Sequence, residues 1–298
     1  MDIANVNDNE LLEEIGRRFK EKQSSIEEME FLTKKLLDMN EKNQKAQEVK
    51  SQFLSLVKNE FNNPISNLLN VANMLTKVKD ISKLNAMGQI LRQDLIKIDF
   101  SLKNIFAASE IEAGEIANDY NHINIKEIFN EVIGYFDLLI EDKGLHVKIV
   151  NEIEDTFVSD SHKIYLILLN LLSNACEFSY PNKDVTLYVK KDENGYILIL
   201  ENFGEGISKD HDKEIYNRFV HFETGHTRAT AGLGLGLSVA RGMCEALDGK
   251  IDNIHEKEAT HFIVYLPKVD ESKLNLSQAF GSNEFLFDDV EDGGMMEF

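Results

Sequence analysis

Residues 231–238 read AGLGLGLS and run directly into an apolar-periodic stretch, residues 239–247, that predicts a helix. Glycines at alternate positions let a backbone approach phosphate oxygens closely, and a helix N-terminus offers unpaired N–H groups and positive potential. The stretch therefore predicts a phosphate-binding turn. Taken alone, it fits a purely structural turn equally well, so the neighbouring sequence has to decide between the two.

Three further blocks upstream carry polar groups suited to such a site. In one predicted helix, Asn170 and Asn174 are four residues apart and so project from one face. The amide oxygen of Asn174 is a reasonable Mg²⁺ ligand beside phosphates, because Mg²⁺ takes few protein ligands and keeps its waters. Residues 200–207 read LENFGEGI after a predicted strand, and residues 214–219 read EIYNRF, which places Arg218 within reach of a phosphate.

The pattern of residues 119–268 predicts an α/β sandwich. Alternating apolar residues, as in THFIVY at 260–265, suit half-buried strands. Helix-like and strand-like stretches alternate in this block, which predicts helices layered on a mixed sheet. The predicted helices are 125–140 and 162–178, and the predicted strands are 145–150, 185–189, 196–201, 250–254 and 261–266.

The N-terminal part of the chain predicts long helices instead, because its only proline is Pro64 and it is rich in Glu, Lys, Gln, Asn and Leu. Apolar or proline residues recur at steps of three and four from 54 to 75, and again from 91 to 105. Residues 51–118 therefore predict a helical hairpin. Two such helices leave apolar stripes that dimerisation into a four-helix bundle would cover. A weaker seam predicts a helical or coiled-coil segment over residues 1–50.

The chain carries 32 Lys plus Arg against 52 Asp plus Glu, a formal charge of −20. This charge argues against DNA or RNA as a partner, because binding either needs clustered Lys and Arg. No apolar run is long enough to span a membrane, and Cys176 and Cys244 make no disulfide framework, so a cytoplasmic protein is expected. Residues 269–298 hold 8 acids and one base, which predicts a disordered acidic tail able to dock on a partner.

The order of these blocks resembles the sensor histidine kinases of two-component systems over roughly residues 51–267. Residues 168–175 are similar to the N box of that family, 202–207 to its first glycine box, 215–219 to its F box and 232–238 to its second glycine box. The resemblance implies a helical-hairpin dimerisation domain, an ATP-binding α/β domain with ATP and Mg²⁺ as ligands, and a lid over 220–231. It also implies a response regulator or another histidine kinase as the partner. The nucleotide-site residues that it implies are Asn170, Asn174, Phe178, Asn202, Gly204, Gly206, Arg218, Arg228, Gly232, Gly234 and Gly236.

The segment similar to the H box, FLSLVKNEFNNP at residues 53–64, departs from the family at its key position. The phosphoacceptor histidine is replaced by Asn59, whose amide does not take a phosphoryl group as an imidazole does, so we expect no autophosphorylation here. The resemblance implies that Glu60 stands where an acid assists kinase chemistry. It implies that Asn63 stands where a side chain positions water during dephosphorylation of a regulator. Simple solvated polar positions also explain Glu60 and Asn63.

Two nucleotide-site positions depart as well. Where the family has an Asp that accepts from the adenine amino group, this chain has Asn202, which loses charge assistance and roughly half the strength of the bond. Where the family has a Lys that points toward the phosphates, this chain has Glu177, a charge of the wrong sign. We expect weakened ATP binding, with retention and loss both open. A single engineered change would explain Asn59 but not these two, which favours natural divergence.

These departures leave two functional hypotheses. The leading one is a degenerate histidine-kinase-like signalling protein, a homodimer that scaffolds, sequesters or dephosphorylates a response regulator or partner kinase. The alternative is an ATP-competent kinase subunit that phosphorylates a histidine of a partner subunit in trans. Asn59 motivates the first, whereas Asn174, Arg218 and the glycines at 232–236 motivate the second.

Overall fold

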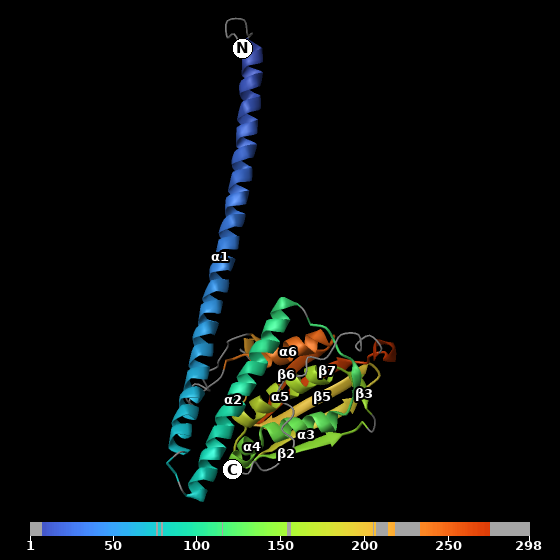
Figure 1. Cartoon of the computed structure of the whole chain (residues 1–298). Helices are drawn as coiled ribbons and strands as arrows, with labels where there is room; N and C mark the ends of the chain where they lie inside the picture. Colours follow the sequence, from blue (N-terminus) through green and yellow to red (C-terminus); the bar gives the residue numbers. More distant parts are fainter. Residues whose placement is uncertain are drawn as a thin grey trace. The chain divides into compact units, whose positions relative to one another are not determined.

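The computed structural model describes residues 8–75, 77–78, 80–114, 116–153, 156–204, 206, 214–217 and 233–274 of the 298-residue chain. The chain divides into two compact units, residues 1–59 and residues 60–298. A helical N-terminal region is followed by an α/β domain with a mixed sheet (Figure 1), which confirms the predicted fold class.

Helix α1 spans Asp8–Leu75. In the first unit its helicity is favoured by ion pairs one turn apart, such as those of Glu14 with Arg17 and Arg18. Apolar side chains of this stretch, Phe19 and Leu36 among them, are exposed. A helix with uncovered apolar side chains suits the predicted coiled-coil segment, which stays a prediction.

Helix α2 spans Ile81–Ala113 and begins at a clear N-cap, because the Asp80 side chain accepts a hydrogen bond from the Ser82 backbone N–H. It ends at Gly114, whose φ of 68° is the left-handed conformation that glycine adopts without strain. Before this helix, the second unit contains the last turns of α1, in which Pro64 and Val71 of the predicted seam are buried.

The burial on α2 is shifted from the predicted seam. Met87 and Asp94 are buried, whereas Leu95, a predicted seam residue, is 55% exposed. Further along, Tyr135 of the α/β domain donates a hydrogen bond to Asp99 of α2 at 2.8 Å. A Cβ added to Gly242 would lie 2.5 Å from Ile111 Cδ1, so α2 packs closely on this domain.

The α/β domain contains a five-stranded sheet in the order β2-β4-β5-β7-β6, with β2 and β4 parallel and the other neighbours antiparallel. A separate antiparallel pair, β1 with β3, was not predicted. The strands are β1 Asn121–Ile123, β2 His146–Asn151, β3 Phe157–Ser159, β4 Asp184–Lys191, β5 Gly195–Phe203, β6 Lys250–Glu256 and β7 Ala259–Pro267. The helices are α3 Ile125–Tyr135, α4 Asp137–Lys143, α5 Ser161–Phe178 and α6 Gly236–Ala246, with a short 3-10 turn at Glu214–Tyr216.

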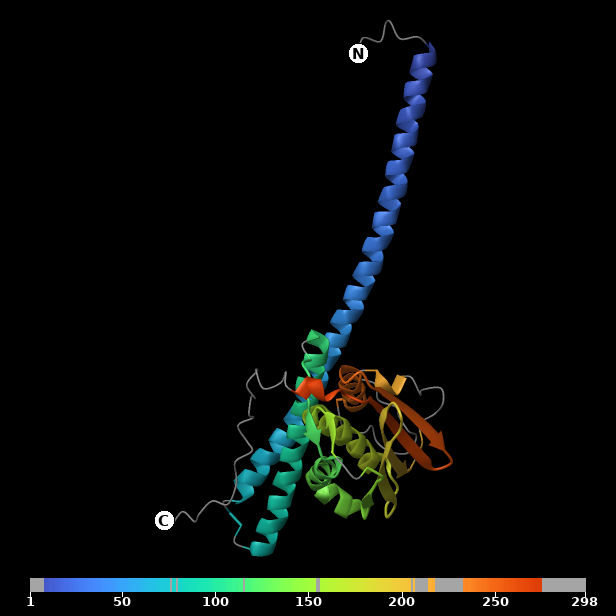
Figure 2. The same ribbon diagram turned by 90° about the vertical axis from the view of Figure 1, so that its right-hand side faces the viewer.

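The core lies between the helices and one face of the sheet. Helices α3, α5 and α6 form a layer over the strands, which Figure 1 shows face-on and Figure 2 shows turned by 90°. Helix α5 is buried along most of its length, and Leu198 and Leu200 of β5 point into the same core as Phe262 of β7. Alternate residues of these strands therefore face the core, as the alternating sequence predicts.

Candidate functional site

The predicted site residues that the structure describes come from three neighbouring elements. Helix α5 packs against both β5 and α6, which brings together segments far apart in the sequence. Helices α5 and α6 approach closely, because a Cβ added to Gly236 would lie 2.8 Å from Asn170 Oδ1. Asn170, Asn174 and Phe178 lie on α5, Asn202 and Gly204 lie at the end of β5 and just after it, Gly206 follows, and Gly234 and Gly236 lie at the start of α6.

Asn202 is a buried amide with one group unpaired. Its side chain is 2% exposed, and its Nδ2 donates to Ser179 Oγ at 3.3 Å. The Ser179 hydroxyl in turn donates to the Ala175 carbonyl oxygen. Asn202 Oδ1 is buried without a hydrogen-bond partner in the described part of the chain. A buried acceptor left unpaired is costly, so this oxygen marks a place where a ligand donor is expected.

Gly204 has a packing role in addition to its place in the predicted glycine box. It forms an isolated antiparallel bridge with Ser179, and a Cβ added to it would lie 1.9 Å from the Phe178 carbonyl oxygen. At Gly206 an added Cβ would lie 1.8 Å from His255 Nε2. Both glycines therefore permit close approach of neighbouring groups, and Gly204 holds the end of α5 against the end of β5.

The two predicted amides of α5 have different environments. Asn170 is 2% exposed, and its Nδ2 donates back to the Leu166 carbonyl oxygen at 2.9 Å, which leaves Oδ1 buried without a partner among the described residues. Asn174 is half-buried, as is Phe178 one turn further on. Asn174 therefore keeps an amide within reach of a ligand, whereas Asn170 belongs to the packed core beside Gly236.

The start of α6 offers backbone N–H donors. Gly234 has a φ of 62°, and α6 begins at Gly236 with no side-chain hydrogen bond from a described residue capping its N-terminus. First-turn N–H groups that lack a cap suit an anion, since the helix dipole adds positive potential there. This geometry fits the phosphate-binding turn predicted from the glycine pattern.

Glu177 is exposed, at the position for which the sequence resemblance implies a lysine. A cation lies close to its backbone: Lys143, the last residue of α4, donates from Nζ to the backbone oxygen of Glu177 at 2.5 Å. Lys143 also donates to the Ser179 oxygen at 3.3 Å, so it caps the carbonyl end of α5. Sequence reasoning missed both Lys143 and Ser179. No local pattern places Lys143 beside the end of α5, and none joins Ser179, the residue after α5, to Asn202.

Several predicted residues lie outside the description. Asn59 and Glu60 belong to α1, but their side chains are outside the described residues, whereas Asn63 is exposed. The described ranges also leave out Arg218, Arg228, Gly232 and the predicted lid at 220–231, as well as the acidic tail after residue 274.

Among the residues that the structure describes, no helix combines the length and the apolarity needed to cross a bilayer.

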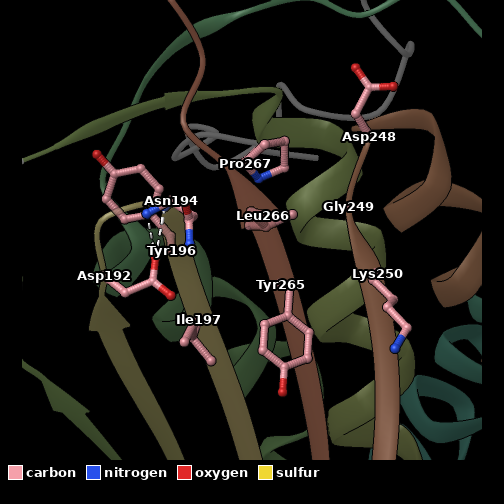
Figure 3. A pocket seen from close by; sticks show the side chains of 11 residues that line it. Asp192, Asn194, Tyr196, Ile197, Asp248, Gly249, Lys250, Tyr265, Leu266 and Pro267 are labelled. Atoms are coloured by element: carbon pink, nitrogen blue, oxygen red, sulfur yellow. Dashed lines mark hydrogen bonds between the residues drawn. The ribbon is translucent and has the colours of Figure 1, made fainter.

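A shallow hollow at the opposite end of the sheet takes no part in this site (Figure 3). It lies beside the β4–β5 turn, between Asp192 and Tyr196 on one side and Lys250 and Pro267 on the other. Strand β5 runs from this hollow to Asn202. The predicted nucleotide residues therefore gather at the far end of β5.

Residues 159–270 match the family described as "Histidine kinase-, DNA gyrase B-, and HSP90-like ATPase", an ATP-binding fold. The curated proteins to which the chain is similar include sensor kinases.

Two relatives illustrate the extent of the similarity. The autoinducer 2 sensor kinase/phosphatase LuxQ of Vibrio parahaemolyticus is 26% identical over 240 residues, which cover 78% of this chain and 28% of LuxQ. The sensor protein RprX of Bacteroides fragilis is 27% identical over 233 residues, which cover 75% of this chain and 44% of RprX. The chain thus spans less than half the length of either relative.

Solved structures show the same fold. The histidine kinase AdeS of Acinetobacter baumannii superposes with a TM-score of 0.50 at 18% identity, over 71% of this chain and 98% of that one. Full-length ShkA in complex with AMPPNP gives a TM-score of 0.53 at 20% identity, over 74% of this chain and 46% of ShkA.

Proposed function

We propose that this protein is a degenerate histidine-kinase-like signalling protein that does not phosphorylate itself in its H-box-like segment. The observation that carries the proposal is Asn59, which occupies the histidine position on α1. The lone pair of a carboxamide nitrogen is delocalised into its carbonyl group, whereas a neutral imidazole has an available nitrogen lone pair. Phosphoryl transfer to Asn59 is therefore not expected.

The protein acts by binding a response regulator or a partner kinase, and it does so as a homodimer. Apolar side chains remain exposed on the helical region of the second unit, with Leu69 at 61% and Leu95 at 55%. Exposed apolar residues at helical spacing support burial against a second copy.

Dephosphorylation of the bound regulator is the finer activity that we infer. Asn63 is exposed on α1, where its amide is accessible to a docked protein. An amide can orient a water molecule without any change in its own protonation. Replacement of Asn63 by Ala is expected to abolish loss of phosphate from a cognate regulator while binding persists. Asn67→Ala, at another exposed amide of the same helix, is the matched control.

A second candidate keeps the nucleotide site active and phosphorylates a histidine of a partner subunit in trans. The unpaired Asn202 Oδ1 and the uncapped start of α6 support it, because one suits a base and the other a phosphate. If ATP binds, Asn174 is the residue that would hold Mg²⁺, which would neutralise phosphate charge. Exposed Glu177 opposes this candidate by repelling phosphate.

Incubation of the full chain with γ-labelled ATP and Mg²⁺ tests the proposal. We expect no stable label on the native chain, and stable self-labelling would overturn the proposal. The matched variant is Asn59→His. Label on this variant alone would show a working nucleotide site and favour the trans-acting candidate, whereas no binding of ATP in calorimetry would exclude that candidate.

A further inference from the structure

The amide of Asn202 has a chemical property that a carboxylate lacks at the same place. An ionised carboxylate only accepts hydrogen bonds, whereas an amide has both an acceptor oxygen and a donor nitrogen of nearly the same shape. Asn202 is 2% exposed, so the group that points away from Ser179 costs free energy unless a ligand satisfies it.

Ser179 can support both orientations of this amide. In the structure, Asn202 Nδ2 donates to Ser179 Oγ while the hydroxyl donates to the Ala175 oxygen, which leaves Asn202 Oδ1 unpaired. If the amide turns over, the Ser179 hydroxyl can rotate and donate to Oδ1 instead. The Ala175 oxygen then keeps its bond from the Ser179 backbone N–H at 3.0 Å. In either orientation, a hydrogen bond therefore joins the Asn202 amide to the Ser179 hydroxyl.

From this geometry we propose that Asn202 makes the base pocket accept a purine with either an amino or a keto group at position 6. This inference rests on the proposed nucleotide site. With Oδ1 directed at the ligand, the pocket accepts from a 6-amino group, as in ATP. With Nδ2 directed at the ligand, the pocket donates to a 6-keto oxygen, as in inosine triphosphate (ITP). Asn202 is therefore a specificity-determining residue whose amide broadens the choice of base.

Calorimetry on the full chain with Mg²⁺ and three triphosphates tests the inference. ITP differs from ATP in its 6-keto group and in the proton on its N1, whereas purine riboside triphosphate keeps the N1 of ATP and carries only hydrogen at position 6. We expect the affinities for ATP and ITP to agree within about threefold, and purine riboside triphosphate to bind about tenfold more weakly than either, since one hydrogen bond is lost. These three measurements need no variant protein.

The variant Asn202→Asp is expected to lower ITP affinity relative to ATP by at least about tenfold, because a carboxylate repels the keto oxygen. Asn104→Asp is the matched control, since Asn104 on α2 is also a buried amide whose Nδ2 bonds its own helix and whose Oδ1 has no partner among the described residues. It should leave the ATP-to-ITP ratio unchanged.

The possible outcomes distinguish a failure of this inference from a failure of the proposed nucleotide site on which it rests. If the native chain binds ATP but binds ITP at least about tenfold more weakly, the inference is wrong and the nucleotide site stands. If purine riboside triphosphate binds as tightly as ATP, position 6 is not read and the inference fails likewise. If none of the three triphosphates binds, the nucleotide site itself is refuted, and the inference with it.

Discussion

At the scale of single residues, Gly204 shows how one missing side chain joins two elements. Its added Cβ would lie 1.9 Å from the Phe178 backbone oxygen, so Gly204→Ala forces β5 and α5 apart. We expect a loss of about 2–3 kcal/mol in the free energy of unfolding, measured by urea denaturation. Gly134→Ala is the control, because nothing lies within 4 Å of its added Cβ in α3. It should gain about 0.5–1 kcal/mol, and equal effects at both sites would contradict the packing role.

Cys176 gives a residue-scale prediction that depends on pH. Burial raises the pKa of its thiol to about 12 in the folded chain, and Cys244 behaves in the same way. In the unfolded chain a thiol ionises near pH ~8.5, so between these values only the unfolded state releases the proton. Stability is therefore unaffected by Cys176 below pH ~8.5 and falls as pH rises toward about 12, by about 1.4 kcal/mol per pH unit for one thiol.

Urea unfolding of the native chain and of Cys176→Ala at several pH values from about 8 to 11 measures this effect. The variant loses packing at every pH, but its stability should fall less steeply with rising pH than that of the native chain. Parallel curves for the two proteins would show that the thiol already ionises in the folded state.

Single residues also show which parts of the candidate site could be predicted from the sequence and which could not. The order of the family-like sequence blocks predicted Asn202 and the glycines of the site. In the structure, those of the predicted residues that are described lie around α5, β5 and α6. Ser179, which holds the Asn202 amide, could not be identified, because their contact depends on a bridge between Ser179 and Gly204 across separate elements. Nothing in the local sequence encodes such a long-range contact.

At the scale of elements, the N-terminus of α5 is joined by hydrogen bonds to the segment before β1. Asp160 caps α5 by accepting from the Lys163 backbone N–H, and its other oxygen accepts from the Asp119 N–H and from Lys163 Nζ. Lys163 Nζ also donates to the Ala117 oxygen at 2.7 Å. Both side chains of the pair are less than a tenth exposed, at 4% for Asp160 and 7% for Lys163.

Asp160→Ala is expected to destabilise the second unit by about 3–5 kcal/mol, because it leaves the buried Lys163 cation without its partner and removes the cap. Thermal and urea unfolding measure the loss. Asp252→Ala is the control, since its pair with Lys250 is mostly solvated, and it should cost less than about 1 kcal/mol. A small loss at Asp160 would mean that the pair contributes little net stability.

The elements themselves were predictable where periodicity was strong and long. All five strands of the large sheet were anticipated within about two residues of their ends, as expected for alternating patterns. Two features escaped. Residues 125–140 contain a helix break at Phe136, whose ring contacts Phe100 and Tyr135. Gly134 alone does not fix the position of this break, because a single Gly is tolerated inside a helix. Strands β1 and β3 have 3 residues each, too short for an alternating pattern.

At the scale of the whole molecule, the second unit exposes apolar side chains that a lone copy does not bury. Leu69 on α1 and Leu95 and Phe106 on α2 are each more than half exposed. Fully burying such a side chain contributes about 1.5–3 kcal/mol, so a few of them per copy can hold a dimer together.

We therefore expect the full chain to sediment as a dimer at micromolar concentration, and Leu95→Glu to sediment as a monomer, because a buried unpaired charge opposes association. Ile254→Glu is the matched control, since Ile254 is 45% exposed but lies on β6, outside the helical hairpin of α1 and α2. The control should remain dimeric. Analytical ultracentrifugation decides between these outcomes, and a native chain that stays monomeric up to about 100 μM would refute both the helical-bundle dimer and the homodimeric form of the proposed function, since that limit leaves about 5 kcal/mol or less for association.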